Sequence, residues 1–183
     1  AHSTTQATNA LLEGDVASVG VIGLGSGFEG LKAKIDTRVP SIELAPNRFL
    51  NPEFQFVSSA GSVDLKEKFS GIVREFKLRG VEVVVASEAF GVDHPGLEEQ
   101  IAAIAKDAGC FATGGHEVSQ LYGLRTRTRT AVINGAILPK MIHTATMTDE
   151  CVKRAGIKAP LMIMRSDGGV MSVEEVHRRP IMT

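Results

Sequence analysis

The chain has few of the residues that mark several common protein classes. Its 183 residues include two cysteines, one tyrosine and no tryptophan. Cys110 and Cys151 are too few for a disulfide framework and lack the neighbouring ligands of a zinc site, so we expect reduced thiols. The scarcity of aromatic residues argues against a stacking platform for single-stranded nucleic acid.

Net charge and long apolar stretches are equally sparse. The formal net charge is -1, which gives no global attraction to nucleic acid or to an anionic membrane. The sequence contains no apolar run long enough to span a bilayer and no signal-peptide pattern. The hydrophobic fraction of 43% is ordinary for a globular domain. We therefore expect a cytoplasmic protein with neither a nucleic-acid nor a membrane partner.

The pattern of apolar residues predicts an α/β fold. Short apolar runs between turn residues predict buried strands, and apolar residues at helical spacing predict helices. The predicted strands cover residues 17–24, 42–44, 81–86, 109–113 and 160–164. The predicted helices cover residues 5–13, 63–79, 95–108 and 118–155, with a short one ending near residue 35. Because a helix joins strands 81–86 and 109–113, these should form a βαβ unit with parallel strands.

The organisation expected from this pattern is one α/β domain over residues 1–183, with any sub-boundary near residues 58–62. Residues 48–61 are the least regular part, although Phe54, Phe56 and Ser58 alternate with their neighbours as in a strand. Pro139 should kink or break the last long helix, because proline lacks the backbone N–H and its ring clashes within a helix.

A glycine-rich segment invites a dinucleotide-binding interpretation. Gly25, Gly27 and Gly30 fit the pattern G-x-G-x-x-G after a predicted strand, and Glu43 follows at about the spacing of a ribose-binding acid. However, a helix already precedes this strand, and the following helix would be short and without a clear apolar stripe. We favour a glycine-rich turn and keep an NAD(P)-binding Rossmann domain as an alternative.

The segment Ser166-Asp-Gly-Gly follows a predicted strand, where open α/β sheets bind ligands. Its two glycines let the backbone approach a ligand closely, and their amides can face an anion. Asp167 could bind a metal or orient water. Equally, the segment could be a tight strand-to-helix turn in which Asp167 bonds its own backbone.

The remaining polar clusters favour structural roles. Three arginines alternate with threonines at residues 125–130, without aromatic residues, and predict a solvated or ion-paired helix face in which Arg127 points away from the other two. His94 and His116 lack partners at metal-ligand spacing, so we expect surface or capping roles.

The first residues crowd more polar side chains than a helix cap needs. His2, Thr4, Thr5 and Asn9 stand in the stretch His-Ser-Thr-Thr-Gln-Ala-Thr-Asn-Ala-Leu. This stretch resembles the His-Gly-Thr-Thr-x-x-Thr-Asn-Ala-Leu segment of the A-type members of the hydantoinase/oxoprolinase family, with Ser3 in place of glycine. Residues 127–134 resemble that family's Arg-Thr-x-Thr-x-x-x-Asn helix. Residues 164–172, followed by Pro180, resemble its Gln-Ser-Asn-Gly-Gly-x-Met-Ser and proline signature, with Asp167 in place of asparagine.

This resemblance implies an actin-like, ribonuclease H-like ATPase fold with a mostly parallel sheet flanked by helices. It implies that the parent protein uses ATP and Mg²⁺ to open a small cyclic amide, such as a hydantoin or 5-oxoproline, with a B-type partner subunit or domain. The family's phosphate loops precede the first motif and follow the last, so we expect a fragment that binds no cofactor and is inactive alone. A non-catalytic actin-like reactivase or scaffold module is the alternative.

The resemblance also nominates site residues. The candidate cleft residues are His2, Thr4, Thr5, Asn9, Arg127, Thr130 and Asn134. The candidate ligand-binding residues are Ser166, Asp167, Gly168 and Gly169.

Overall fold

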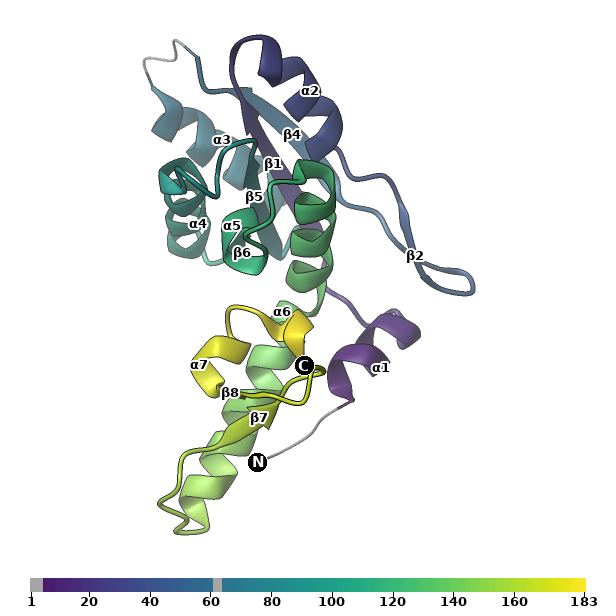
Figure 1. Cartoon of the computed structure of the whole chain (residues 1–183), viewed down its shortest axis with the longest axis vertical. Helices are drawn as coiled ribbons and strands as arrows, with labels where there is room; N and C mark the ends of the chain where they lie inside the picture. Colours follow the sequence, from purple (N-terminus) through teal and green to yellow (C-terminus); the bar gives the residue numbers. More distant parts are fainter. Residues whose placement is uncertain (1–4, 61–63) are drawn as a thin grey trace.

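The computed structural model describes residues 5–60 and 64–183. Its main feature is a four-stranded parallel sheet with the strand order β4-β1-β5-β6 (Figure 1). The strands are β1 (Val19–Gly25), β4 (Glu53–Ser58), β5 (Val83–Glu88) and β6 (Phe111–Gly114). The βαβ prediction is confirmed, because β5 and β6 pair in parallel.

Helices cover both faces of this sheet. They are α2 (Gly27–Thr37), α3 (Leu65–Leu78), α4 (Gly96–Asp107), the short α5 (Gly115–Val118) and α6 (Leu124–Arg154). Along β5, Val83 and Val85 pack in one apolar cluster with α6 residues, whereas Val84 and Ala86 pack in another with α3 and α4 residues. Successive side chains of a strand point to opposite faces, so a strand covered on both faces is a continuous apolar run.

The strand order creates a switch point at the carboxyl ends of β1 and β5. The chain leaves β1 through α2 and returns to the sheet as β4 on one side of β1. It leaves β4 through α3 and returns as β5 on the other side of β1. Open α/β sheets bind ligands in the crevice beyond such a point. The fold therefore directs attention to the loops after β1 and β5.

A second group of elements packs below the sheet around the later part of α6 (Figure 1). It contains α1 (Gln6–Glu13), β7 (Met162–Met164), β8 (Val170–Ser172), α7 (Val173–Val176) and a 3-10 helix (Pro180–Met182). Ala10, Met141, Ile163 and Val176 are buried together in its core. The boundary near residues 58–62 stays a prediction, since residues 61 and 62 lie outside the described residues.

The buried strand predicted over residues 160–164 is wrong in its placement. β7 pairs antiparallel with β8 in a separate two-stranded sheet, and of its three residues only Ile163 is buried. A short apolar run is compatible with a central strand and equally with a hairpin that packs one side chain against a helix. β7 pairs with the neighbouring β8 and not with a strand of the main sheet.

Pro139 does not break α6, which is a single helix of 31 residues. The two halves of the helix run in different directions in Figure 1, so the proline bends it. Ile137, Leu138 and Met141 are buried on either side of the proline. Burial of these side chains offsets the cost of an interior proline, which is about 3 kcal/mol.

The glycine-rich segment is a strand-to-helix turn with close packing. A Cβ on Gly25 would lie 2.7 Å from the Ala33 Cβ and 3.2 Å from the Gly30 Cα, so these glycines let α2 lie against β1. Glu43 lies on β2 (Ile42–Ala45), which pairs only with β3 (Arg48–Leu50) in a separate hairpin. A ribose-binding acid would follow the strand beside β1, so the placement of Glu43 disagrees with the NAD(P) interpretation.

Two glycine substitutions should have opposite effects on stability. A Cβ on Gly20 would lie 2.5 Å from the ring of the buried Phe76, and overpacking of this kind should lower the free energy of unfolding by about 2 kcal/mol in Gly20→Ala. Gly71, within α3, has open space around its Cβ position, so Gly71→Ala should raise that free energy by about 0.5 kcal/mol. Urea unfolding followed by circular dichroism measures both. A neutral Gly20→Ala variant would contradict the packing of α3 on β1.

Candidate functional site

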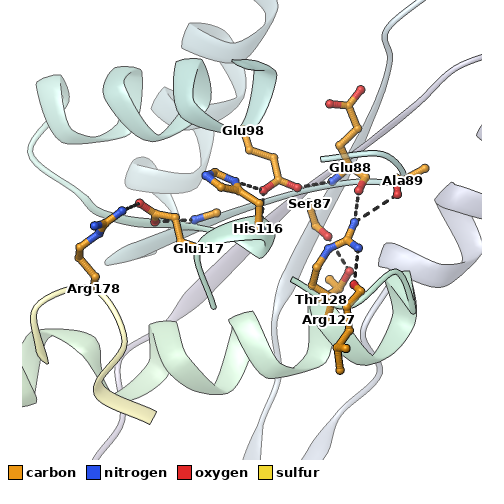
Figure 2. A network of polar contacts seen from close by, with 11 residues as sticks. Ser87, Glu88, Ala89, Glu98, His116, Glu117, Arg127, Thr128 and Arg178 are labelled. Atoms are coloured by element: carbon orange, nitrogen blue, oxygen red, sulfur yellow. Dashed lines mark hydrogen bonds and ion pairs between the residues drawn. The ribbon is translucent and has the colours of Figure 1, made fainter. Parts of the chain in front are cut away.

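A buried carboxylate organises the carboxyl ends of β5 and β6 (Figure 2). Glu98, in the first turn of α4, is 0% exposed. Its Oε1 accepts a hydrogen bond of 2.7 Å from the Glu88 N–H. Its Oε2 is 2.9 Å from the His116 backbone nitrogen, which donates to it, and 2.6 Å from His116 Nδ1. Glu98 therefore joins the last residue of β5 to α5, which directly follows β6.

Two neighbours of Glu98 have shifted pKa values. The hydrogen bond that His116 donates to the Glu98 carboxylate raises the pKa of His116, although partial burial acts in the opposite direction. Burial, and next the charge of Glu98, raise the pKa of Glu88. The expected surface or capping role of His116 is wrong, because its ring is bound to a buried carboxylate.

Three glycines allow the backbone to wrap around Glu98. A Cβ on Gly91 would lie 2.3 Å from Glu98 Oε1, and a Cβ on Gly114 would lie 3.0 Å from Glu98 Oε2. A Cβ on Gly115 would lie 3.2 Å from Ser87 Oγ. These close approaches explain why glycine occupies positions 91, 114 and 115.

Arg127 ties the same loop to the start of α6. Its side chain is buried, and its guanidinium donates from Nη1 to the Leu121 carbonyl at 2.8 Å. Its Nη2 donates to the Glu88 carbonyl and, at 3.3 Å, to the Ala89 carbonyl. Burial lowers the pKa of Arg127. The buried guanidinium therefore holds residues 88–89 against residue 121.

The predicted solvated arginine face is wrong for Arg127 and correct for Arg125. The Arg125 guanidinium pairs with Asp36 at 3.0 Å, and its side chain is 72% exposed. Residues two apart on a helix do not share a face, so Arg127 turns toward the sheet while Arg125 faces α2.

A pocket of about 340 Å³ opens beside this network. Ala89 and Phe90 contribute from the loop after β5, and Gly123 contributes from the start of α6. The polar lining residues are Glu29, Lys32, Asp36, Tyr122, Arg125 and Thr126. The two cations, Lys32 and Arg125, are balanced by two carboxylates, Glu29 and Asp36. The positive end of the α6 dipole is therefore the feature that favours a ligand group with negative or developing negative charge. The pocket lies at the switch point of the sheet.

Thr130 and Asn134 make contacts within the protein. Thr130 Oγ1 donates to the Thr126 carbonyl at 2.9 Å, one turn earlier in α6. Asn134 Nδ2 donates to the Arg178 carbonyl at 3.0 Å, and Asn134 Oδ1 accepts from the Ile181 N–H at 3.2 Å. Asn134 therefore fastens the C-terminal segment to α6.

Residues 166–169 form the hairpin turn between β7 and β8, so the expected location at a main-sheet strand end or a strand-to-helix turn is wrong. Asp167 Oδ1 accepts from the Gly169 N–H at 3.0 Å, and Asp167 Oδ2 pairs with Arg165 at 2.5 Å. Gly168 has a φ of 85°, which glycine adopts without strain. Ser166 donates from its backbone N–H to the Met182 carbonyl at 2.9 Å.

The nominated residues do not gather at one place. Thr5 and Asn9 are exposed at the start of α1, in the group of elements below the sheet. His2 and Thr4 lie outside the described residues. Arg127 alone among the nominated residues with described positions joins the Glu98 network. The ligand roles of all these residues stay predictions.

The sequence interpretation did not select Glu98, Ser87 or Thr128. Ser87 and Thr128 share a hydrogen bond of 2.7 Å between their hydroxyl oxygens. The sequence did contain one signal for a site here. The polar pair Ser87-Glu88 directly follows an apolar run, and open α/β sheets bind ligands beyond the carboxyl ends of their strands. In the described part of the chain, no three histidine, cysteine, aspartate or glutamate side chains lie close enough to hold a metal ion. No described helix is both long and apolar enough to cross a membrane.

Comparison with known sequences defines the class of protein. The N-terminal region of the hydantoinase/oxoprolinase family matches residues 1–109, and the hydantoinase/oxoprolinase family itself matches residues 127–183. The chain therefore belongs to the hydantoinase/oxoprolinase family.

One curated relative is the alpha subunit of the caprolactamase of Pseudomonas jessenii. It is 26% identical over 184 residues, which cover 92% of this chain and 26% of the relative. This chain therefore spans about a quarter of the relative's length.

Two solved structures share the fold. The ATP-dependent caprolactamase of Pseudomonas jessenii matches with a TM-score of 0.67 and 23% identity, over 93% of this chain and 27% of that one. Nucleotide-free acetone carboxylase matches with a TM-score of 0.67 and 16% identity, over 98% of this chain and 29% of that one. The fold-class prediction, a mostly parallel sheet flanked by helices, is confirmed.

The raised pKa of His116 predicts a pH dependence of stability. The folded protein binds the ring proton more tightly than the unfolded chain, whose pKa is near the ordinary 6.5. The stabilisation is thus complete below that value and is lost as the pH rises through the folded pKa. We expect the unfolding free energy of the wild type, relative to His116→Gln, to be constant below about pH 6 and to fall as the pH rises above the ordinary histidine value of 6.5. Urea titrations of both proteins measure this, and parallel profiles would contradict it.

Proposed function

We propose that this chain is part of an ATP-dependent protein that opens a cyclic amide. The family match along most of the chain carries the proposal, and the relative named an ATP-dependent caprolactamase supports the substrate class, because a lactam is a cyclic amide. The chain spans only about a quarter of that relative, so the activity belongs to a longer protein. We further propose a cytoplasmic location and a B-type partner, in keeping with a relative whose name makes it one subunit of a larger enzyme.

The chemistry must overcome the poor reactivity of an amide carbon. The amide oxygen attacks the γ-phosphorus of ATP, and the bond to ADP breaks. Water then adds to the activated carbon, and the ring nitrogen takes a proton and leaves, which opens the ring to an acyl phosphate. A second water attacks the acyl carbon, and the bond between that carbon and the phosphate oxygen breaks, which releases phosphate and the open-chain acid. Phosphorylation thus turns the amide oxygen into a good leaving group.

We assign the pocket at the sheet's carboxyl edge to the ligand cleft of this reaction. Its volume of about 340 Å³ is in the range of small-ligand sites. Lys32 and Arg125 line it beside the start of α6, where they would stabilise negative charge that develops on the transferring group. Glu98 and Arg127 would act as positioning residues, since they fix the loop that forms one wall. We assign no residue of this chain to Mg²⁺.

The test uses the longer protein with its partner subunit. Phosphate release and amino-acid formation are measured with ATP, Mg²⁺ and a panel of caprolactam, 5-oxoproline and a hydantoin. We expect ATP-dependent opening of at least one ring, and a loss of about tenfold or more in Lys32→Ala. Lys158→Ala, an exposed lysine outside the pocket, is the matched control and should retain activity. Residues 1–183 alone should be inactive.

Two outcomes would contradict this proposal. Full activity in Lys32→Ala would show that the pocket at the sheet's carboxyl edge is not the ligand cleft. A folded complex that is inactive across the panel would favour the non-catalytic reactivase or scaffold module.

A further inference from the structure

A second pocket, of about 620 Å³, lies between the end of α2 and the first turns of α6. Four cationic side chains line it: Lys34, Arg38, Arg125 and Arg129. The single acidic lining residue is Asp36, and both of its described hydrogen bonds come from Arg125, at 3.1 and 3.0 Å. Within residues 5–60 and 64–183, Lys34, Arg38 and Arg129 make no ion pair. The pocket therefore has positive charge that the described chain does not neutralise.

Favourable interactions with the helix dipoles account for only two of these four cations. Lys34 and Arg38 stand at the C-terminal end of α2, where cations are favourable. Arg125 and Arg129 stand in the first two turns of α6, where the dipole disfavours cations and where like charges four residues apart repel. An anion between the two helices would remove both penalties.

Part of the lining of the pocket is apolar. Ile35, Val39 and Pro40 line it, and Ile35 is 65% exposed to solvent. A large exposed aliphatic side chain surrounded by cations suits a ligand that has an apolar body as well as charge. The volume is in the middle of the range for small-molecule sites.

We propose that this pocket binds a small organic anion with an apolar body and two or more negative charges on carboxylate or phosphate groups. Arginine side chains bind both groups through paired hydrogen bonds, so the shared chemistry is an oxyanion on an apolar frame. The site is separate from the pocket at the sheet's carboxyl edge, with the Asp36–Arg125 pair on the wall between them. It does not depend on the proposed amide chemistry.

Calorimetry on the purified protein tests the site with three probes. Isophthalate offers two carboxylates on a ring, phenyl phosphate offers a phosphate on a ring, and malonate offers two carboxylates without an apolar body. We expect saturable binding of isophthalate or phenyl phosphate, and the stronger of the two identifies the preferred group. That binding should weaken with added salt, because exposed charges are screened. Malonate should bind at least tenfold more weakly than isophthalate.

The matched variants locate the site. The double variant Arg38→Gln/Arg129→Gln should weaken binding at least tenfold, while Arg74→Gln, an exposed arginine on α3, should leave it unchanged. Circular dichroism and urea unfolding confirm that each variant is folded. Absence of binding by both ring probes at millimolar concentration would overturn the proposal. So would equal binding by the double variant, or malonate binding as tight as that of isophthalate.

Discussion

Replacement of Arg127 with methionine should lower the free energy of unfolding by about 3–4 kcal/mol, because it removes a buried guanidinium that donates three hydrogen bonds to backbone carbonyls. The guanidinium is 1% exposed and donates to the carbonyls of Leu121, Glu88 and Ala89. Methionine fills much of the space but donates nothing. Urea unfolding, followed by far-ultraviolet circular dichroism, measures the loss.

The matched control is Arg129→Met, two residues along the same helix. Arg129 is exposed, so its replacement should change the unfolding free energy by no more than about 0.5 kcal/mol. Equal effects of the two substitutions would mean that helix propensity or net charge determines stability here. The proposed role of Arg127 in holding residues 88–89 would then be wrong.

Replacement of Glu98 with alanine should cost about 3 kcal/mol, because two backbone amides and an imidazole lose their acceptor. The effect should also be local. The amides of Glu88 and His116 donate to this carboxylate at 2.7 and 2.9 Å, so their hydrogen exchange should quicken more than that of amides within β1.

Glu99→Ala is the control for this substitution, since Glu99 is exposed in the same first turn of α4. It should leave both stability and exchange of the two amides nearly unchanged. Unchanged exchange in Glu98→Ala would show that other contacts hold these loops.

The elements that could be predicted from the sequence are those with a local signal. The apolar runs at residues 17–24 and 81–86 predicted two central strands, and the helical spacing over residues 63–79, with Asp64 near its start, predicted α3. Asp64 indeed caps this helix, accepting from the Glu67 N–H at 2.9 Å. These signals depend only on residues that are close together in the sequence.

The features that were missed depend on distant partners. Glu98 is buried because donors from residues 88 and 116 meet it, and no local pattern distinguishes it from the exposed Glu99. The placement of β7 depends on whether its three residues pair with a strand of the main sheet or with β8. The bend in α6 at Pro139 was predicted as one of two outcomes, and burial of the side chains beside the proline explains why the helix continues through it. The motif at residues 166–169 identified the family correctly, yet its position in a hairpin came only from the structure.

Label transfer from the amide to phosphate tests the proposed function most directly. The longer protein and its partner subunit would turn over a cyclic amide, from the panel above, whose carbonyl carries ¹⁸O, with ATP in unlabelled water. If the amide oxygen is phosphorylated and leaves with phosphorus, the label appears in inorganic phosphate, and both carboxylate oxygens of the product come from water. Label that stays in the carboxylate, or ring opening without phosphate release, would contradict the proposal.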